Sequence, residues 1–195
     1  MFEIRQTEVF AAWFRNLRDR RARARIQVRI DRLSLGNAGD AKAVGEGVLE
    51  LRIDYGPGYR VYFVRRGDTV IVLLAGGDKR TQARDVNTAL RLARYLQEVA
   101  MTVTKMIPWN TEDHLETPED IAAYLEAVFE DGDPELIGHA LGAVARSKGM
   151  TEIAHRTGLG RQSLYKALSP EGRPEFETVL KVVRALGLKL TVTSA

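Results

Sequence analysis

The hydrophobic positions of the first half change from a helical period to a β-strand period. Apolar residues recur every three or four positions between Val9 and Leu17, which predicts a helix that Thr7 can cap. The same spacing predicts a second helix over about residues 20–33. The strand period follows in "VLELRI", "YRVYFV" and "TVIVLLA", which are separated by the turn sequences "DYGPG" and "RRGD". These runs predict an antiparallel meander, and a helix over about residues 86–96 follows it.

The turn between the first two strands predicts their register. If the chain turns near Gly56, Leu51 faces Val61 on the buried side of the sheet. Arg52 then faces Arg60 on the opposite side, where two like charges repel each other. We therefore expect an anion between the two arginines. A slip of one residue would move every side chain to the other face, so this expectation depends on the register.

Two further groups of basic residues have an ordinary and a functional interpretation. Lys79 and Arg80 follow the Gly76-Gly77 pair that is expected to end the third strand, and they are either plain surface or part of a site. The outer face of the second helix is either a solvated face or an electrostatic footprint for phosphates. The arginines on that face are Arg21, Arg23, Arg25, Arg29 and Arg32.

The second half begins with a different pattern. Residues 101–116 are polar and irregular and predict an extended arm. Thr117 and Asp133 each precede a proline and an acidic residue, which is the pattern of a capped helix start. Apolar residues at helical spacing follow both signals, so two helices are expected here.

The stretch "MTEIAHRTGLGRQSLYKAL" predicts a helix-turn-helix over about residues 150–168 rather than an ordinary helical hairpin. Ala154 permits close packing of the two helices, and Gly158 permits the turn between them. A last helix that stops at Gly187 and a terminal β-tail, "LKLTVT", are expected to follow, and an exposed tail strand invites pairing between copies. The candidates for contact with DNA bases and phosphates on the second helix are Arg161, Gln162, Ser163, Tyr165 and Lys166.

Charge differs between the two halves. Residues 1–100 carry 19 Lys and Arg against 12 Asp and Glu, whereas residues 101–195 carry 10 against 14. This favours nucleic-acid contact for the first half and electrostatic complementarity between the halves, although two unrelated solvated surfaces would give the same numbers. The chain has no cysteine, which excludes disulfides and favours the reducing cytoplasm. It has no apolar run long enough for a membrane span, so no membrane partner is expected.

On these motifs, the first half resembles the RelE/HigB-type toxins of bacterial toxin–antitoxin modules, and more narrowly the phage-derived addiction-module killer proteins. The resemblance covers about residues 1–97 and rests on "LELRIDYGPGYRVYFVRRGDTVIVLLAGGDKRTQ". It implies a small α/β RNase fold that cuts mRNA, usually on the ribosome. The best-studied members add a tyrosine after the basic pair, but "TQARDVNTA" has none, and Tyr62 is the nearest substitute. The other residues that the resemblance assigns to the site are Arg52, Arg60, Lys79 and Arg80.

The chemistry of such a site is workable with these residues. Cleavage of RNA by its own 2′-OH needs a base, charge stabilisation at phosphorus and an acid for the leaving 5′-oxygen. Arginine stays protonated, so Arg60, Arg80 and Arg52 suit a phosphate clamp. Lys79 is the nearby group that can act as acid or base. No metal or other cofactor is expected, because residues 1–100 contain no histidine and no compact carboxylate–histidine cluster.

The second half resembles the HigA-like addiction-module antidote proteins, which have an Xre/Cro-type DNA-binding fold, over nearly all of residues 101–195. Because Met101 looks like a start residue at the junction, the two resemblances together imply an antitoxin fused behind its toxin. The expected protein is an autoinhibited endoribonuclease joined to a repressor that binds its own operator. The acidic segment at about residues 112–135 is expected to contact the basic toxin, and a two-fold dimer is expected if the DNA site is palindromic.

The alternative is a DNA-binding regulator whose toxin half is catalytically inactive and acts as a corepressor, which the missing tyrosine favours. With either function, the expected fold class is α+β. A RelE-like domain of two helices, an antiparallel meander and a C-terminal helix occupies residues 1–100. An extended arm occupies residues 101–116. An all-α helix-turn-helix domain with a short terminal β-tail occupies residues 117–195.

Overall fold

The chain forms two compact units, Met1–Asn110 and Thr111–Ala195. The computed structural model describes residues 1–98, 106–169 and 172–191. Met101, the start-like residue at the predicted junction, therefore lies outside the described residues. The first unit contains helices and a sheet, whereas the described part of the second unit is helical. The first unit includes residues 106–110, which the sequence pattern placed in the arm.

Six strands form one sheet in the first unit, in the order β2-β3-β4-β5-β1-β6. Strands β3, β4 and β5 are antiparallel neighbours, as the sequence predicts, and β1 runs parallel to β5. The register of the first predicted hairpin is confirmed, because Leu51 lies opposite Val61 and Arg52 lies opposite Arg60. The strands are β1 (Glu3–Gln6), β2 (Ala41–Gly45), β3 (Val48–Ile53), β4 (Tyr59–Arg66), β5 (Val70–Asp78) and β6 (Ile107–Pro108).

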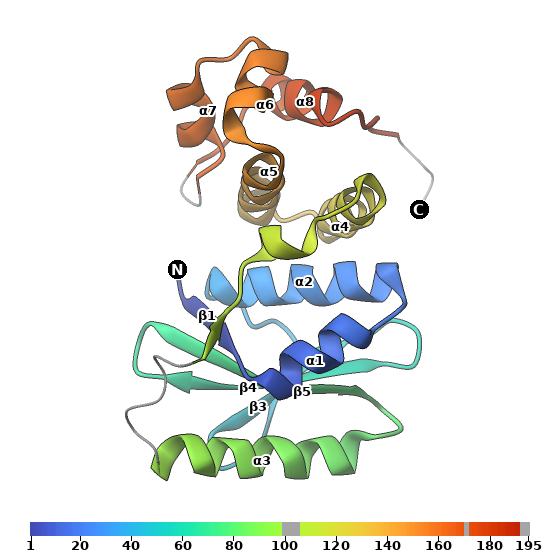
Figure 1. Cartoon of the computed structure of the whole chain (residues 1–195), viewed down its shortest axis with the longest axis vertical. Helices are drawn as coiled ribbons and strands as arrows, with labels where there is room; N and C mark the ends of the chain where they lie inside the picture. Colours follow the sequence, from blue (N-terminus) through green and yellow to red (C-terminus); the bar gives the residue numbers. More distant parts are fainter. Residues whose placement is uncertain (99–105, 170–171, 192–195) are drawn as a thin grey trace. The chain divides into compact units, whose positions relative to one another are not determined.

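Helices cover both faces of this sheet. Figure 1 shows α1 (Glu8–Asn16) and α2 (Arg20–Ser34) on one face and α3 (Gln82–Glu98) on the other. The first face buries Phe10 and Phe14 of α1 among the inward residues of α2 and the strands. The second face buries Tyr62 and its strand neighbours under α3. Successive side chains of the strands therefore point into two apolar layers in turn. The polar site described below lies in the layer on the α3 side.

The sheet contains three strands that the sequence pattern did not predict. Strand β1 is too short for a clear alternation, and the sequence of β2, "AKAVG", is rich in residues of low β propensity. Strand β1 is held by its pairing with β5, which is distant in the sequence, and β2 is held by its pairing with β3 across a turn. Strand β6 lies in the predicted arm. Strand β5 also continues through Gly76-Gly77 to Asp78, where the sequence predicted its end.

Three of the five arginines expected on the outer face of α2 contact other parts of the first unit. The guanidinium of Arg23 lies 5.5 Å from the ring centre of Phe14, and that of Arg25 lies 4.9 Å from Tyr55. The guanidinium of Arg29 donates to the Ala38 carbonyl at 2.9 Å. These contacts hold the helix against α1 and against two loops of the first unit. Arg23, Arg25 and Arg29 therefore have structural contacts, in addition to whatever solvent or phosphate the outer face meets.

The second unit begins with a short 3₁₀ helix at Thr111–His114 and continues with five α-helices. The two predicted helix starts are confirmed, because the Thr117 and Asp133 side chains accept hydrogen bonds from the backbone of α4 and α5. Phe176, the first residue of α8, is 70% exposed although it is apolar. The helices are α4 (Pro118–Asp131), α5 (Pro134–Lys148), α6 (Met150–Thr157), α7 (Arg161–Ala167) and α8 (Phe176–Ala185).

The predicted terminal β-tail has no counterpart in residues 188–191, which form neither helix nor strand. The rest of the tail, residues 192–195, lies outside the described residues. In the described ranges of the chain, no helix combines the length and the apolar character that crossing a bilayer requires.

Candidate functional site

Two arginines lie directly opposite each other on the α3 side of the sheet. Arg52 of β3 pairs with Arg60 of β4, and the hairpin between them closes when the Gly58 amide donates to the Tyr55 carbonyl at 3.0 Å. Gly58 has a φ of +77°, a backbone conformation that favours glycine. The turn sequence therefore sets the register that brings the two guanidinium groups together.

A buried glutamate supplies the negative charge between these arginines. The Arg52 Nε donates to Glu50 Oε1 at 3.0 Å, and the Arg60 Nε lies 3.6 Å from the same oxygen. The Glu50 side chain is 1% exposed, whereas those of Arg52 and Arg60 are 35% and 14% exposed. The expected anion is thus a carboxylate of the protein itself. Glu50 precedes Arg52 by two residues on one strand, and this spacing was the sequence signal that could have identified it.

The rest of the Glu50 carboxylate is held by neutral donors. Its Oε2 accepts from Gln82 Nε2 at 2.6 Å and from the Tyr62 hydroxyl at 3.2 Å. Burial alone would raise the pKa of Glu50, but the bonds from Arg52, Gln82 and Tyr62, together with the charge of Arg60, hold it below the ordinary value. Glu50 is therefore ionised at neutral pH and fixes the arginines in place. Sequence reasoning identified neither Glu50 nor Gln82.

Tyr62 lies at the base of this site and is fully buried. Burial raises the pKa of its hydroxyl, and the neighbouring Glu50 carboxylate raises it further. The phenol therefore stays protonated and donates to Glu50. In this position it supports the glutamate and is not open to a large substrate.

The predicted basic pair lies next to the same hairpin. The Lys79 amide donates to the Gly58 carbonyl at 3.0 Å. A Cβ at Gly58 would be 3.5 Å from the Arg60 guanidinium and 3.8 Å from the Lys79 Cβ, so the end of the Arg60 side chain and the start of the Lys79 side chain both lie close to this glycine. Lys79 is exposed. Arg80 is also exposed, and its guanidinium forms an ion pair with Asp78 at 2.7 Å.

The arrangement suits an anion such as a phosphodiester. Arg52 and Arg60 are partly open guanidinium groups on neighbouring strands, and the exposed Lys79 follows the adjacent strand. Such groups bind phosphate oxygens through paired N–H donors. Within the described ranges, no group of three or more His, Asp or Glu side chains is placed to hold a metal ion.

A second candidate surface lies on α7 of the second unit. The C-cap of α6 is Gly158, with a φ of +69°, and it makes the predicted turn. Ala154 and Leu164 are buried between the helices. The Arg161 guanidinium lies 5.6 Å from the ring centre of Tyr165. All five predicted DNA-contacting residues, Arg161, Gln162, Ser163, Tyr165 and Lys166, are exposed.

Known proteins similar to this chain match it in two parts. Residues 12–96 match the family "Phage derived protein Gp49-like (DUF891)", and residues 105–194 match "Probable addiction module antidote protein". An uncharacterized protein of Haemophilus influenzae is 47% identical over 94 residues, which are 48% of this chain and 95% of that protein. A second uncharacterized protein of the same organism is 43% identical over 84 residues, which are 43% of this chain and 87% of that protein.

These relatives are about half as long as this chain, so at least one half exists elsewhere as a separate protein. No solved structure matches the chain at a significant level. The two family matches support the predicted toxin–antitoxin relationship, with the toxin family first and the antidote family second. The chain therefore belongs to the phage-derived Gp49-like family through residues 12–96 and to the family of probable addiction-module antidote proteins through residues 105–194.

Proposed function

We propose that this chain is a toxin–antitoxin module in one chain, in which a RelE/HigB-like endoribonuclease is silenced by a HigA-like antidote. The observation that carries the proposal is the Arg52–Arg60 pair, held by the buried Glu50 on the surface next to Lys79. The two partly exposed guanidinium groups and the Glu50 carboxylate together carry one net positive charge, which complements the single negative charge of a phosphodiester. The substrate proposed for this site is mRNA, cut on the ribosome in the cytoplasm.

The proposed reaction uses the RNA's own 2′-oxygen as the nucleophile. This oxygen attacks the adjacent phosphorus and loses its proton, while the bond from phosphorus to the 5′-oxygen breaks and that oxygen gains a proton. The products are a cyclic phosphate and a 5′-hydroxyl. Arg52 and Arg60 stabilise the negative charge that develops on the phosphoryl oxygens. Lys79 is the exposed amine beside them and is assigned to proton transfer.

Glu50 is a positioning residue in this proposal. It is almost fully buried, so it acts through Arg52 and Arg60 rather than on the RNA. Tyr62 and Gln82 hold the carboxylate from its other side. The geometry of the phosphate clamp is therefore fixed before the substrate arrives, which is the condition for strong electrostatic stabilisation of a transition state.

The second unit is proposed to bind operator DNA and repress transcription as a homodimer. Its candidate reading surface is α7, with Arg161 and Gln162 at the N-terminal end, where side chains of a recognition helix reach base edges. Lys166 and Ser163 are suited to phosphate contacts. The covalent link gives the antidote a high effective concentration at the toxin.

The test is growth of a bacterial host after induction of residues 1–110, the full chain, or residues 1–110 with Arg60→Ala. Residues 1–110 are chosen because they form a compact unit with its own core. We expect arrest with the unaltered fragment and normal growth in the other two strains. Normal growth with a soluble, folded fragment 1–110 would contradict the nuclease proposal.

The second candidate function is a DNA-binding regulator with an inactive toxin half that acts as corepressor. Two observations favour it: "TQARDVNTA" lacks a tyrosine, and the substitute Tyr62 is buried. The same growth test separates the two functions. A corepressor predicts no arrest by residues 1–110, together with weaker operator binding when the first unit is removed from the full chain.

A further inference from the structure

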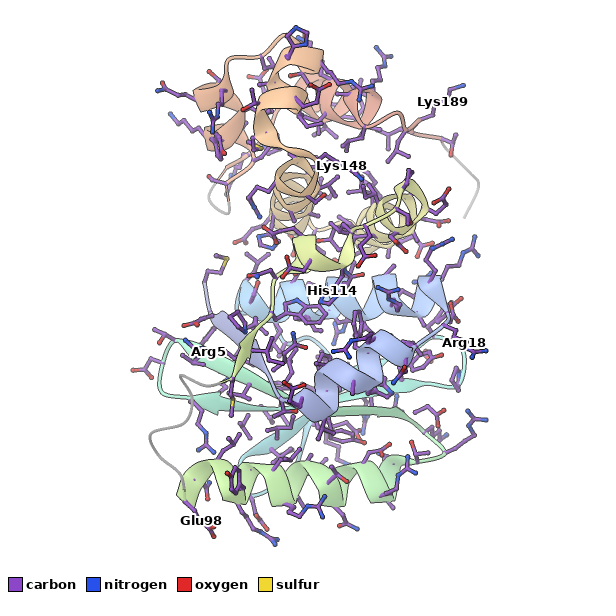
Figure 2. All side chains as sticks on the ribbon, viewed as in Figure 1. Arg5, Arg18, Glu98, His114, Lys148 and Lys189 are labelled. Carbon is purple, nitrogen blue, oxygen red and sulfur yellow. The ribbon has the colours of Figure 1, made fainter. Side chains whose placement is uncertain are left out.

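A short segment of the chain crosses the boundary between the two families. Residues 106–110 lie within the match to the antidote family, which covers residues 105–194. In the structure, however, they belong to the first compact unit, Met1–Asn110, which also contains the Gp49-like match at residues 12–96. Helix α3 ends at Glu98, which is labelled in Figure 2. The next described residue is Met106, which directly precedes β6 at the edge of the sheet. We call residues 106–110 the anchor segment.

The anchor segment adds the last strand to the sheet. Ile107 pairs with Gln6 and Pro108 pairs with Arg5, so β6 runs antiparallel to β1. The Trp109 amide donates to the Ile4 carbonyl at 3.0 Å, and the Gln6 side chain donates to the Pro108 carbonyl at 3.3 Å. Without β6, strand β1 would be an open sheet edge. A strand ending in proline covers such an edge and does not extend the sheet further.

Trp109 is the main side-chain contact of the anchor segment. Its ring centre lies 5.0 Å from Phe14 and 5.8 Å from Phe10, and both pairs meet edge to face. Only 7% of Trp109 is exposed. On the opposite side of the sheet, Met106 packs against the apolar layer under α3. The anchor segment therefore contacts both apolar layers at the β1 edge, with Trp109 in one layer and Met106 in the other.

We infer that residues 106–110 are the recognition segment by which an antidote of this type binds a Gp49-like domain, whether the two are fused or are separate chains. The binding site is the β1 edge together with the rings of Phe10 and Phe14, and its partner is an extended peptide with a tryptophan anchor. This inference rests on the proposed toxin–antidote relationship. Because at least one half exists elsewhere as a separate protein, a covalent link cannot be the general means of holding the halves together.

The anchor segment gives affinity without filling the arginine site. Strand β6 is separated from β4, which carries Arg60, by β5 and β1. At about 4.8 Å per strand, the two lie roughly 14 Å apart across the sheet. Residues 1–110 should therefore be active with the anchor segment in place, while an antidote that lacks this segment should lose its hold on the toxin domain.

The first experiment cuts the full chain between Glu98 and Met106 at an inserted protease site and measures whether the two fragments stay together. Because β6 pairs with β1 and Trp109 is buried, we expect the cut protein to elute as one complex at micromolar concentration. Trp109→Ala should raise the dissociation constant at least about 100-fold, since loss of a buried tryptophan is among the costliest truncations. Phe176→Ala, which removes a 70% exposed aromatic from the same fragment, is the matched control and should leave the constant unchanged.

A competition measurement keeps the test independent of how well Trp109→Ala folds. A synthetic peptide covering residues 103–112 is added in excess to the cut unaltered protein, beside the same peptide with alanine at position 109. Release of the antidote fragment by the tryptophan peptide alone supports the inference. The inference is overturned if the cut halves separate unaided, if neither peptide releases the fragment, or if both do so equally. No RNA is present in either measurement, so failure of the anchor and failure of the nuclease proposal give different results.

Discussion

The arginine site on the sheet and the exposed face of α7 are both cationic, but they hold their side chains in opposite ways. Arg60 is 14% exposed and is fixed by its position over Glu50, whereas the five candidate residues of α7 are all exposed. A fixed clamp suits one small reacting group, such as a phosphodiester, because its charges need no rearrangement. An exposed helix face suits a long partner, because side chains can adjust to several bases and phosphates. The difference shows that burial, more than charge, distinguishes a candidate active site from a reading surface.

The largest expected effect tests the fixed side of this comparison. Arg60→Ala in residues 1–110 should lower the rate of RNA cleavage by about 10²–10³-fold, the usual loss when one group that stabilises transition-state charge is removed. The measurement is cleavage of a labelled mRNA by purified protein on ribosomes. Arg94→Ala removes an exposed arginine that pairs with Glu46 on the same unit, and it should stay within about twofold of the unaltered rate. Equal losses in both variants would mean that general charge, rather than the site, drives the reaction.

The next effect concerns the stability of the arginine site. Glu50→Ala should lower the free energy of unfolding of the first unit by about 3 kcal/mol, because it leaves two opposed arginines and two neutral donors without their acceptor. Urea unfolding followed by tryptophan fluorescence measures this unit alone, since Trp13 and Trp109 are the two tryptophans of the chain. Glu3→Ala, which removes an exposed carboxylate, should cost less than about 0.5 kcal/mol. If Glu50→Ala lowers the free energy of unfolding as little as Glu3→Ala does, the buried carboxylate does not hold the site.

On α7, replacement of an arginine by alanine should weaken DNA binding without changing the stability of the fold. Arg161→Ala should weaken binding of the full chain to DNA from upstream of its gene by about tenfold or more, the cost of one lost base contact. Its unfolding midpoint should not change, because Arg161 is exposed. Fluorescence anisotropy gives the affinity, and Arg184→Ala on α8 is the exposed control. A fall in stability equal to that of Glu50→Ala would remove the contrast between the two surfaces.

The smallest effect is a dependence of stability on acid pH that Glu50 contributes. Folding lowers the pKa of Glu50 from its ordinary value of 4.5, so the unfolded chain binds more protons near that pH. The stabilisation is therefore complete above this value and is lost as the pH falls through the lower pKa of the folded state. The unfolding free energies of the unaltered chain and of Glu50→Gln should differ by a constant amount above about pH 5.5 and converge below pH 4. A difference that stays constant down to pH 3 would contradict the ionised, hydrogen-bonded Glu50.

Local patterns in the sequence predicted a large part of both surfaces. The "DYGPG" turn predicted the register that pairs Arg52 with Arg60, because the length of a turn sets which residues lie opposite each other. Ala154 and Gly158 predicted the helix pair that exposes α7, because close packing and a left-handed turn need small residues at those positions. Each of these features depends on residues that are near one another along the chain.

Contacts between distant residues were decided by the tertiary structure alone. The parallel pairing of β1 with β5, the bond from Gln82 to Glu50, and the docking of Trp109 on Phe10 and Phe14 join residues that are remote in sequence. The local hydrophobic period does not predict such contacts, because the same apolar or polar residue could contact many different partners before the chain folds. The sequence thus specified the opposed arginines and helix α7, the candidate recognition helix. The folded chain placed the buried glutamate between the arginines and set the start of the antidote-family segment on the edge of the toxin-family sheet.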